Sequence, residues 1–91
     1  MNKQELIKKI AADSEVTQRQ AAIVLENTLN AIITAVAAGE KVQLLGFGTF
    51  EPKKRAARIG RNPATQEILE IPASTIPAFK AGVEFKEAVD R

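Results

Sequence analysis

Cysteine, histidine, tryptophan and tyrosine are all absent from this 91-residue chain, and phenylalanine is its only aromatic residue. Without cysteine there is no disulfide and no thiol nucleophile, and without cysteine or histidine there is no zinc site of the usual structural type. General acid–base catalysis would fall to lysines and carboxylates, and the carboxylates are spread along the chain with no evident pairing. We therefore expect a protein that is not an enzyme and that binds no cofactor, metal or small-molecule substrate.

Long hydrophobic runs are missing as well. No stretch reaches the roughly 18 consecutive apolar residues of a membrane span, and the first residues lack the apolar segment of a signal peptide. We expect a cytoplasmic protein with no membrane partner. A chain this short buries a comparatively small fraction of its surface, and it has neither disulfides nor a structural metal to add stability. Oligomerisation is the remaining common source of additional burial.

Net positive charge is confined to one segment of the chain. The formal net charge of the chain is +2, and residues 1–40, 41–52 and 62–91 contribute −1, 0 and −2 of it. Residues 53–61 contribute +5. A local block of like charge creates a strong field and releases counterions when it meets phosphates. This segment is therefore the predicted binding surface for a polyanion.

The N-terminal part of the chain shows two helical patterns. Asn2 and Glu5 are spaced as an N-terminal cap, and apolar residues recur behind them at helical spacing. Thr17 and Gln20 form a second capping box, which opens a longer helix that Gly39 closes. These signals predict a short amphipathic helix followed by a long one.

The long helix has an unusually wide apolar surface. Its stripe is joined by further aliphatic residues and six alanines, so one short neighbouring helix cannot cover it. A partner subunit is the simplest way to cover this surface. The stripe consists of Leu25, Leu29, Ile32, Ile33 and Val36.

After the second helix the hydrophobic period changes to that of strands. Residues 42–45 are predicted as a strand, 46–48 as a turn with a buried Phe47 ring, and 49–51 as the returning strand. Pro52 cannot donate a hydrogen bond to a sheet, so we expect it at an edge or a bulge. The pattern predicts a hairpin.

The basic segment and residues 67–71 can pair as a projecting two-stranded ribbon, with residues 60–63 at its tip. Few large apolar residues lie in the basic segment, so the ribbon should be mobile when free. Residues 83–89 are predicted as a short final helix that follows Gly82.

Such a ribbon has the form of a DNA-binding arm. Cations along its edges can meet phosphates, which fixes position without reading bases. The ring of Pro63 is apolar, rigid and without an N–H, so it can wedge between base pairs and unstack a step. Arg61 and Asn62 suit the floor of the minor groove, where base readout is degenerate. We expect bending with weak sequence preference.

The chain resembles the bacterial HU and integration host factor family, and it is most similar to an HU homodimer subunit. The resemblance runs without a gap from residue 1 to about residue 90. It is carried by Gly46-Phe47-Gly48-Thr49-Phe50, Arg55, Arg58, Gly60, Arg61-Asn62-Pro63-x-Thr65, Ile71-Pro72-Ala73 and Pro77-x-Phe79-Lys80-x-Gly82.

The family implies an α+β fold: two N-terminal helices, a three-stranded antiparallel sheet with a protruding two-stranded β-ribbon arm, and a short C-terminal helix, in an intertwined dimer. It implies a single DNA-binding domain over residues 1–91. Residues 1–39 would be the helical dimerisation part, and residues 40–91 would hold the sheet, the arm at about 53–75 and the last helix. HU-type proteins are architectural proteins that bend double-stranded DNA by minor-groove wedging and that compact it in the nucleoid.

The resemblance also assigns roles to individual residues. Pro63 would be the intercalating tip, with Arg61 and Asn62 beside it. The DNA-binding residues would be Lys3, Lys53, Lys54, Arg55, Arg58, Arg61, Asn62, Pro63, Thr65, Lys80 and Lys86, of which Lys3, Lys80 and Lys86 would line a saddle between two arms. The dimer core would contain Leu29, Ile32, Val36, Leu44, Phe47, Phe50 and Phe79.

Three positions depart from the family pattern. Family members often have glycine in place of Gln66, proline in place of Ala81 and a basic residue in place of Val83. The departure at Val83 removes a phosphate contact, and Glu67 and Glu70 reduce the positive charge of the returning arm strand. We expect modest or strongly salt-sensitive DNA affinity.

Two alternatives stay open at the level of the sequence. The chain could be a sequence-selective subunit of the integration host factor type, paired with a paralogue in a heterodimer. It could instead use the basic arm to bind RNA or another protein. Competition between intact duplex DNA, nicked duplex DNA and RNA separates these hypotheses, since a wedge favours duplexes that are already distorted.

Overall fold

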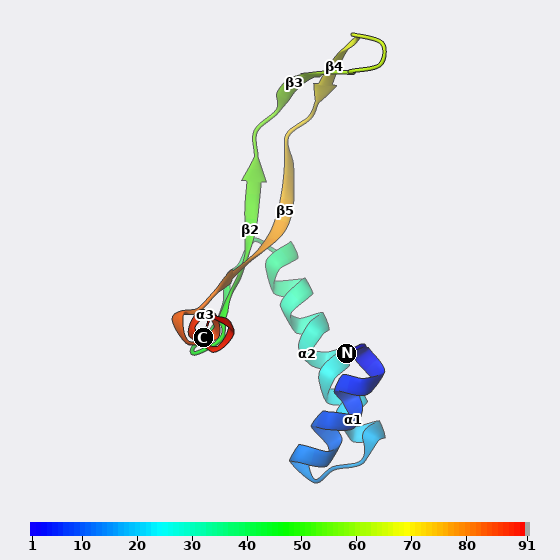
Figure 1. Ribbon diagram of the computed structural model, residues 1–91, viewed down its shortest axis with the longest axis vertical. Helices are drawn as coiled ribbons and strands as arrows, with labels where there is room; N and C mark the ends of the chain where they lie inside the picture. Colours follow the sequence, from blue (N-terminus) through cyan, green and yellow to red (C-terminus); the bar gives the residue numbers. More distant parts are fainter. Residues whose placement is uncertain (91) are drawn as a thin grey trace. The chain divides into compact units, whose positions relative to one another are not determined.

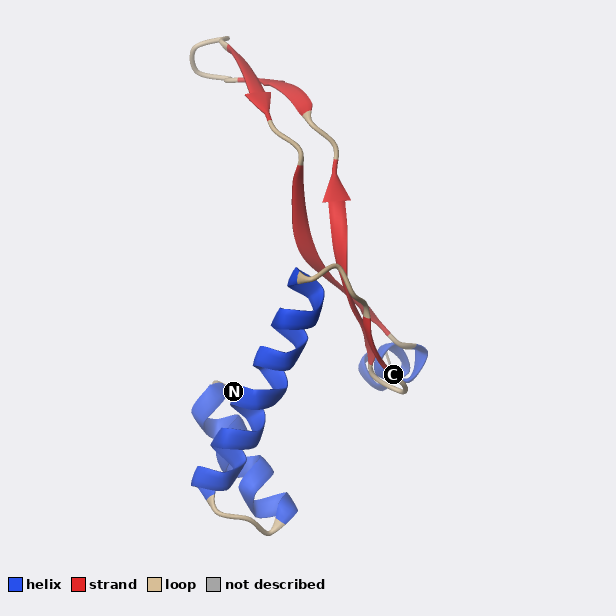
Figure 2. Ribbon diagram, turned by 180° about the vertical axis from the view of Figure 1, so that it is seen from behind, coloured by secondary structure: helices blue, strands red, loops and turns tan. Residues whose placement is uncertain are grey.

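The structure is a computed structural model that describes residues 1–90, and it divides into two compact units, Met1–Thr34 and Ala35–Arg91. Its helices and strands are distinguished by colour in Figure 2. The predicted α+β fold is confirmed. The elements are α1 (Lys3–Ser14), α2 (Gln18–Ala37), β1 (Val42–Leu44), β2 (Gly48–Arg55), β3 (Arg58–Arg61), β4 (Ile68–Ile71), β5 (Ser74–Ala81) and α3 (Val83–Val89).

The predicted helix ends are confirmed, because each is set by a local hydrogen bond or backbone conformation. The Asn2 side chain accepts a hydrogen bond from the Glu5 backbone N–H at 2.9 Å. Before α2, the Thr17 hydroxyl accepts from the Gln20 backbone N–H at 3.0 Å, and the side-chain Oε1 of Gln20 accepts from the Thr17 backbone N–H at 2.9 Å. This reciprocal pair satisfies two of the unpaired donors at a helix start. Gly39 follows α2 with a left-handed φ of 91°.

The helical unit buries very little of its apolar surface. Ala11 and Ala21 are the only residues of the described chain that are buried hydrophobics. Along α2, Ile23, Val24 and Ile33 are each more than half exposed. By its length and its mean hydropathy of 1.3, α2 could also cross a membrane, but an apolar helix covered by a second protein chain has the same composition.

The second unit is built on a three-stranded antiparallel sheet with the strand order β1-β2-β5. Figure 1 shows β2 and β5 side by side. The register pairs Val42 with Phe50 and Phe50 with Phe79. Because residues directly opposite each other point to the same side of a sheet, these three side chains share one face. We call it the phenylalanine face.

A cluster of four phenylalanines packs on this face and against α3. Ring centroids lie 4.7 Å apart for Phe50 and Phe79, 5.1 Å for Phe47 and Phe85, and 5.3 Å for Phe47 and Phe79. The backbone of β2 passes close to the cluster at Gly48. A Cβ at this position would lie 2.5 Å from the Lys80 carbonyl oxygen and 2.6 Å from the Phe79 ring. Only glycine fits there.

The prediction that Phe47 is buried is wrong for the chain by itself, since this residue is 43% exposed. Phe47 lies in the turn between β1 and β2, and Leu45, which was predicted to end the first strand, is 92% exposed in the same turn. Phe79 of the same cluster is 41% exposed as well. The phenylalanine cluster therefore has an uncovered surface, like the helical unit.

β2 is longer than the sequence predicts and continues through Pro52 to Arg55. Pro52 lies opposite Pro77 of β5. Antiparallel ladders alternate between hydrogen-bonded and non-hydrogen-bonded pairs, so two facing prolines suit a non-hydrogen-bonded pair. On its other side β2 is free at this point, because β1 reaches only as far as the partner of Phe50. Pro52 therefore lies at an edge, as expected, although β2 does not end there.

Candidate nucleic-acid interface

The sheet face opposite the phenylalanine face is polar. On β2 it carries Thr49, Glu51, Lys53 and Arg55, which alternate with the residues of the phenylalanine face. Lys80 of β5 lies opposite Thr49 and belongs to the same side. We call this side the polar face. It places three of the predicted DNA-binding cations on one surface.

The polar face holds one carboxylate between two lysines. Glu51 Oε1 lies 3.1 Å from Lys80 Nζ, and Glu51 Oε2 lies 3.5 Å from Lys41 Nζ. The Glu51 side chain is only 13% exposed, whereas the two lysine side chains are more than 70% exposed. The hydrogen bond from Lys80, together with the charges of both lysines, lowers the pKa of Glu51 below its usual value. The carboxylate is therefore ionised at neutral pH.

The ribbon beyond the sheet is a second, separate ladder. Pairing between β2 and β5 ends at Arg55 and Ser74, and pairing between β3 and β4 starts at Arg58 and Ile71. Residues 56–57 and 72–73 interrupt the ribbon, as Figure 1 shows. The predicted pairing with residues 67–71 thus holds for Arg58 to Arg61, the second half of the basic segment. The first half, Lys53 to Arg55, pairs with β5 instead.

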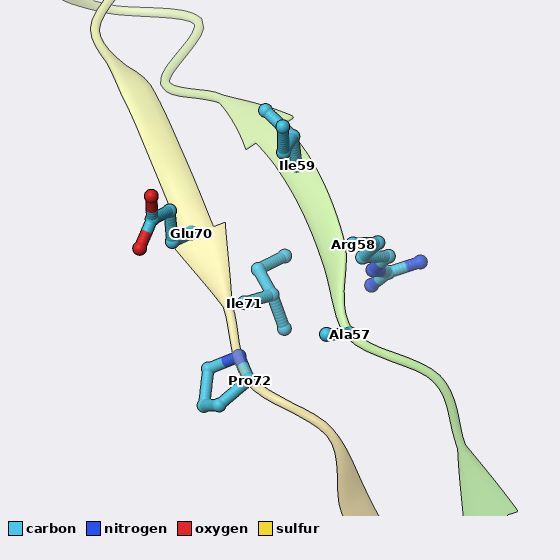
Figure 3. Close-up of a pocket in the computed structure, with 6 residues that line it drawn as sticks. All are labelled: Ala57, Arg58, Ile59, Glu70, Ile71 and Pro72. Atoms are coloured by element: carbon cyan, nitrogen blue, oxygen red, sulfur yellow. The ribbon is translucent and has the colours of Figure 1, made fainter.

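A shallow hollow marks this interruption, and it is lined by residues 57–59 and 70–72. Figure 3 shows the Ile71 side chain between the two strands, with Arg58 and Glu70 on opposite edges of the ribbon. Arg58 and Ile71 are direct cross-strand partners. The hollow is open, and its polar groups are on its outer edges.

The tip of the arm differs from the prediction, which placed residues 60–63 there. Gly60 and Arg61 belong to β3, where they pair with Leu69 and Ile68. The loop starts instead at Asn62, whose N–H donates to the Glu67 carbonyl oxygen at 2.8 Å. Long-range strand pairing, which the local turn signal did not include, shifts the tip toward the C-terminus.

The tip loop is closed by its own hydrogen bonds. Asn62 Oδ1 accepts from the Ala64 N–H at 2.9 Å, and the Asn62 carbonyl oxygen accepts from the Gln66 N–H at 2.7 Å. The Thr65 hydroxyl accepts from the Glu67 N–H at 3.4 Å. Pro63 is exposed inside this closed loop. The loop therefore presents the rigid apolar ring of Pro63, and the side-chain amide of Asn62 is on the neighbouring residue.

Gln66 is the second non-glycine residue of the described chain with a positive φ, at 63°, after Glu15. A left-handed conformation costs a residue with a Cβ roughly 1 kcal/mol, and glycine avoids this cost. The structure thus gives a physical reason for the family's frequent glycine at this position.

The remaining predicted DNA-binding residues are distributed over both units. Lys54 lies on the phenylalanine-face side of β2, opposite Thr75, so the arm carries cations on both of its sides. Lys86 is exposed on α3. Lys3 lies in the helical unit, where it forms an ion pair with Glu26.

Sequence reasoning missed two kinds of residue in this interface. Lys41 and Glu51 were not predicted as site residues. They are the next pair after Val42 and Phe50 in the hairpin register, which places them opposite each other. The apolar content of the arm was also underestimated, since Ile59, Ile68, Leu69 and Ile71 are all exposed on it. The alternation of side chains between the two faces of each strand could have indicated both kinds of residue.

Comparisons with known proteins agree with this geometry. The family model described as "Bacterial DNA-binding protein" matches residues 1–90. DNA-binding protein HU of Clostridium pasteurianum is 52% identical over 91 residues, which is 100% of both chains. DNA-binding protein HU of a Nostoc species is 53% identical over 89 residues, which is 98% of this chain and 95% of the relative.

Solved structures give the same result. An Anabaena HU–DNA cocrystal structure is 53% identical and superposes with a TM-score of 0.92 over 98% of this chain and 97% of the other. HU from Thermotoga maritima is 32% identical, with a TM-score of 0.69 over 98% of both chains. The chain belongs to the family of bacterial DNA-binding proteins that includes HU.

Proposed function

We propose that this chain is a subunit of a homodimeric, histone-like protein that binds double-stranded DNA through the minor groove, bends it with little sequence preference and compacts it in the nucleoid. The observation that carries the proposal is the arm, a cationic two-stranded ribbon that ends in a closed loop with an exposed proline. The family membership and the Anabaena HU–DNA structure support it.

The arm is suited to gripping phosphates on both sides of a groove. Lys53 and Arg55 project from one side of β2, and Lys54 projects from the other. Contacts of this kind fix the position of a protein on the duplex and carry no sequence information. The affinity should therefore depend strongly on salt and weakly on sequence.

The width of the groove explains why binding and bending are coupled. The undistorted minor groove is only about 6 Å wide, whereas two paired strands are already about 4.8 Å apart before their side chains are counted. A ribbon therefore fits more easily into a groove that has been opened. Insertion of the Pro63 ring between base pairs unstacks a step at a cost of a few kcal/mol and opens the groove, and the additional phosphate contacts offset that cost.

The small amount of apolar surface that one chain buries supports a second subunit. Only Ala11 and Ala21 are buried hydrophobics among the described residues, and large apolar side chains are exposed in both units. A chain of 91 residues cannot offset its ordering entropy with so little burial. We propose a second copy of the chain as the partner, in an intertwined dimer with Leu29, Ile32, Val36, Leu44, Phe47, Phe50 and Phe79 in its core.

Competition binding tests the function directly. A labelled random duplex is displaced, at fixed salt, by unlabelled intact duplex, nicked duplex or duplex RNA of equal length. We expect the nicked duplex to compete best and the RNA worst, since a nick lowers the cost of bending. A preference of more than about a thousandfold for one DNA site would favour a sequence-selective subunit instead, and stronger competition by RNA would favour an RNA-binding arm.

Replacing Arg55 with alanine should weaken binding equally on all duplex sequences. The plot of log affinity against log salt should become shallower by about 0.9 for each phosphate contact that is lost, and a homodimer loses two. Arg19→Ala removes the same charge from an exposed position of α2 and serves as the matched control. An unchanged slope in the Arg55 variant would remove this residue from the interface.

A further inference from the structure

The polar face contains an anion at the position where phosphate binding calls for cations. Glu51 is on β2, the central strand of the sheet, and it pairs with one lysine on each side. Lys41 immediately precedes β1, and Lys80 belongs to β5. Each lysine ammonium pairs with a different oxygen of the same carboxylate, at 3.5 and 3.1 Å.

This arrangement changes the charge that the polar face presents. Two lysines and one carboxylate carry a net charge of +1 instead of +2. The carboxylate is nearly covered, at 13% exposure, while both lysine side chains are more than 70% exposed and accessible to a ligand. A phosphate that approaches either ammonium therefore has to share it with Glu51, or displace Glu51 from it.

We infer that Glu51 is an internal competitor for DNA phosphate, which limits the affinity of the polar face and reduces the number of counterions that DNA binding releases. The inference rests on the proposed DNA-binding function and specifies a residue that tunes it. A lysine that is already paired with a carboxylate has fewer counterions to displace from the DNA, because its positive charge is partly neutralised within the protein.

The position of Glu51 in the fold supports this role. Its neighbours at two-residue spacing on the same side of β2 are Thr49 and Lys53, so the carboxylate lies in line with the cations that continue toward the arm. Alternate residues on a strand are roughly 7 Å apart, which is within one Debye length at physiological salt. Glu51 thus lowers the potential where the sheet joins the arm.

Substitution of Glu51 by glutamine tests the inference, since it removes the charge and keeps the shape. We expect the variant to bind a fluorescein-labelled random duplex more tightly, by at least about threefold at 50 mM salt, with a salt slope steeper by about 0.9 for each lysine released. For one released lysine in each subunit of the homodimer, the slope changes by about 1.8, and the advantage should shrink about twelvefold between 50 and 200 mM salt. Glu15→Gln is the control, because Glu15 has the same charge and no ion pair to any described residue.

A double-mutant cycle separates competition from a merely structural role. In a background with Lys41→Gln and Lys80→Gln, the additional change Glu51→Gln should raise affinity and slope much less than it does in the wild type, because no lysine is left to release. The gain that remains measures the repulsion between the carboxylate and phosphate. Urea unfolding of each variant without DNA establishes that it is folded, and if Glu51→Gln lowers stability, Glu51→Ala in the same cycle replaces it.

Three results would overturn the inference. They are weaker duplex binding by the Glu51 variants, affinity and slope equal to those of the wild type, and an effect that is equally large without the two lysines. Failure of the proposed function looks different, because the wild-type protein itself would then show no salt-dependent duplex binding. In that case the inference fails with it.

Discussion

The variant Pro63→Ala should lose more of the bend than of the DNA affinity. Pro63 carries no charge, so its removal takes away none of the cations that contact phosphates. The ring, however, is the exposed apolar group at the tip of the closed loop, and unstacking a base step requires such a wedge. Fluorescence transfer between the two ends of a short duplex gives bend and affinity from one titration.

Pro63→Leu distinguishes a wedge from a turn residue. Leucine keeps an apolar side chain of sufficient size and is itself one of the residues that wedge between base steps, so bending should partly return. Pro72→Ala, at the interruption of the ribbon, removes a proline ring away from the tip and should leave the bend intact. Parallel loss of bend and affinity in Pro63→Ala, or no rescue by leucine, would contradict the wedge.

A charge at Leu29 of α2 should abolish the dimer and with it the folded state. Leu29 is 40% exposed in the single chain, and we place it in the dimer core. An uncompensated charge buried there costs at least about 3 kcal/mol for each chain, whereas a small domain has about 5–15 kcal/mol of stability in total. For Leu29→Glu we expect a large fall in the midpoint of thermal unfolding and in helical circular dichroism.

The companion variant Asn27→Glu adds the same charge at an exposed polar position of α2 and should change the stability by less than about 0.5 kcal/mol. Sedimentation of the wild type at micromolar concentration should give twice the chain mass. A wild-type protein that sediments as a stable, folded monomer would exclude the dimer, and a Leu29→Glu variant as stable as its control would remove Leu29 from the interface.

The parts of the fold that the sequence predicts well are those with local causes. The caps at Asn2 and Thr17 join residues three positions apart, and the left-handed Gly39 ends α2 without help from any other element. The final helix also has the predicted bounds, Val83–Val89. For the two caps and Gly39 the interacting groups are within one helical turn, so a short stretch of sequence contains all of the information.

The errors occur where distant segments pair. β2 continues through Pro52 because Pro77, 25 positions further along, is opposite it. Gly60 and Arg61, which have the composition of a turn, become part of β3 because Leu69 and Ile68 are available as partners. Strand pairing depends on the register of both segments, and neither segment alone specifies it.

By itself, the sequence determined where the positive charge lies, that the second helix has a wide apolar surface, and the family to which the chain belongs. Only the tertiary structure decided on which side of the ribbon each cation projects, that the tip begins at Asn62, and that Glu51 sits between Lys41 and Lys80. The physical reason is that charge and helix capping are properties of residues close together in the chain, whereas ion pairs across strands exist only once the register has brought separate segments side by side.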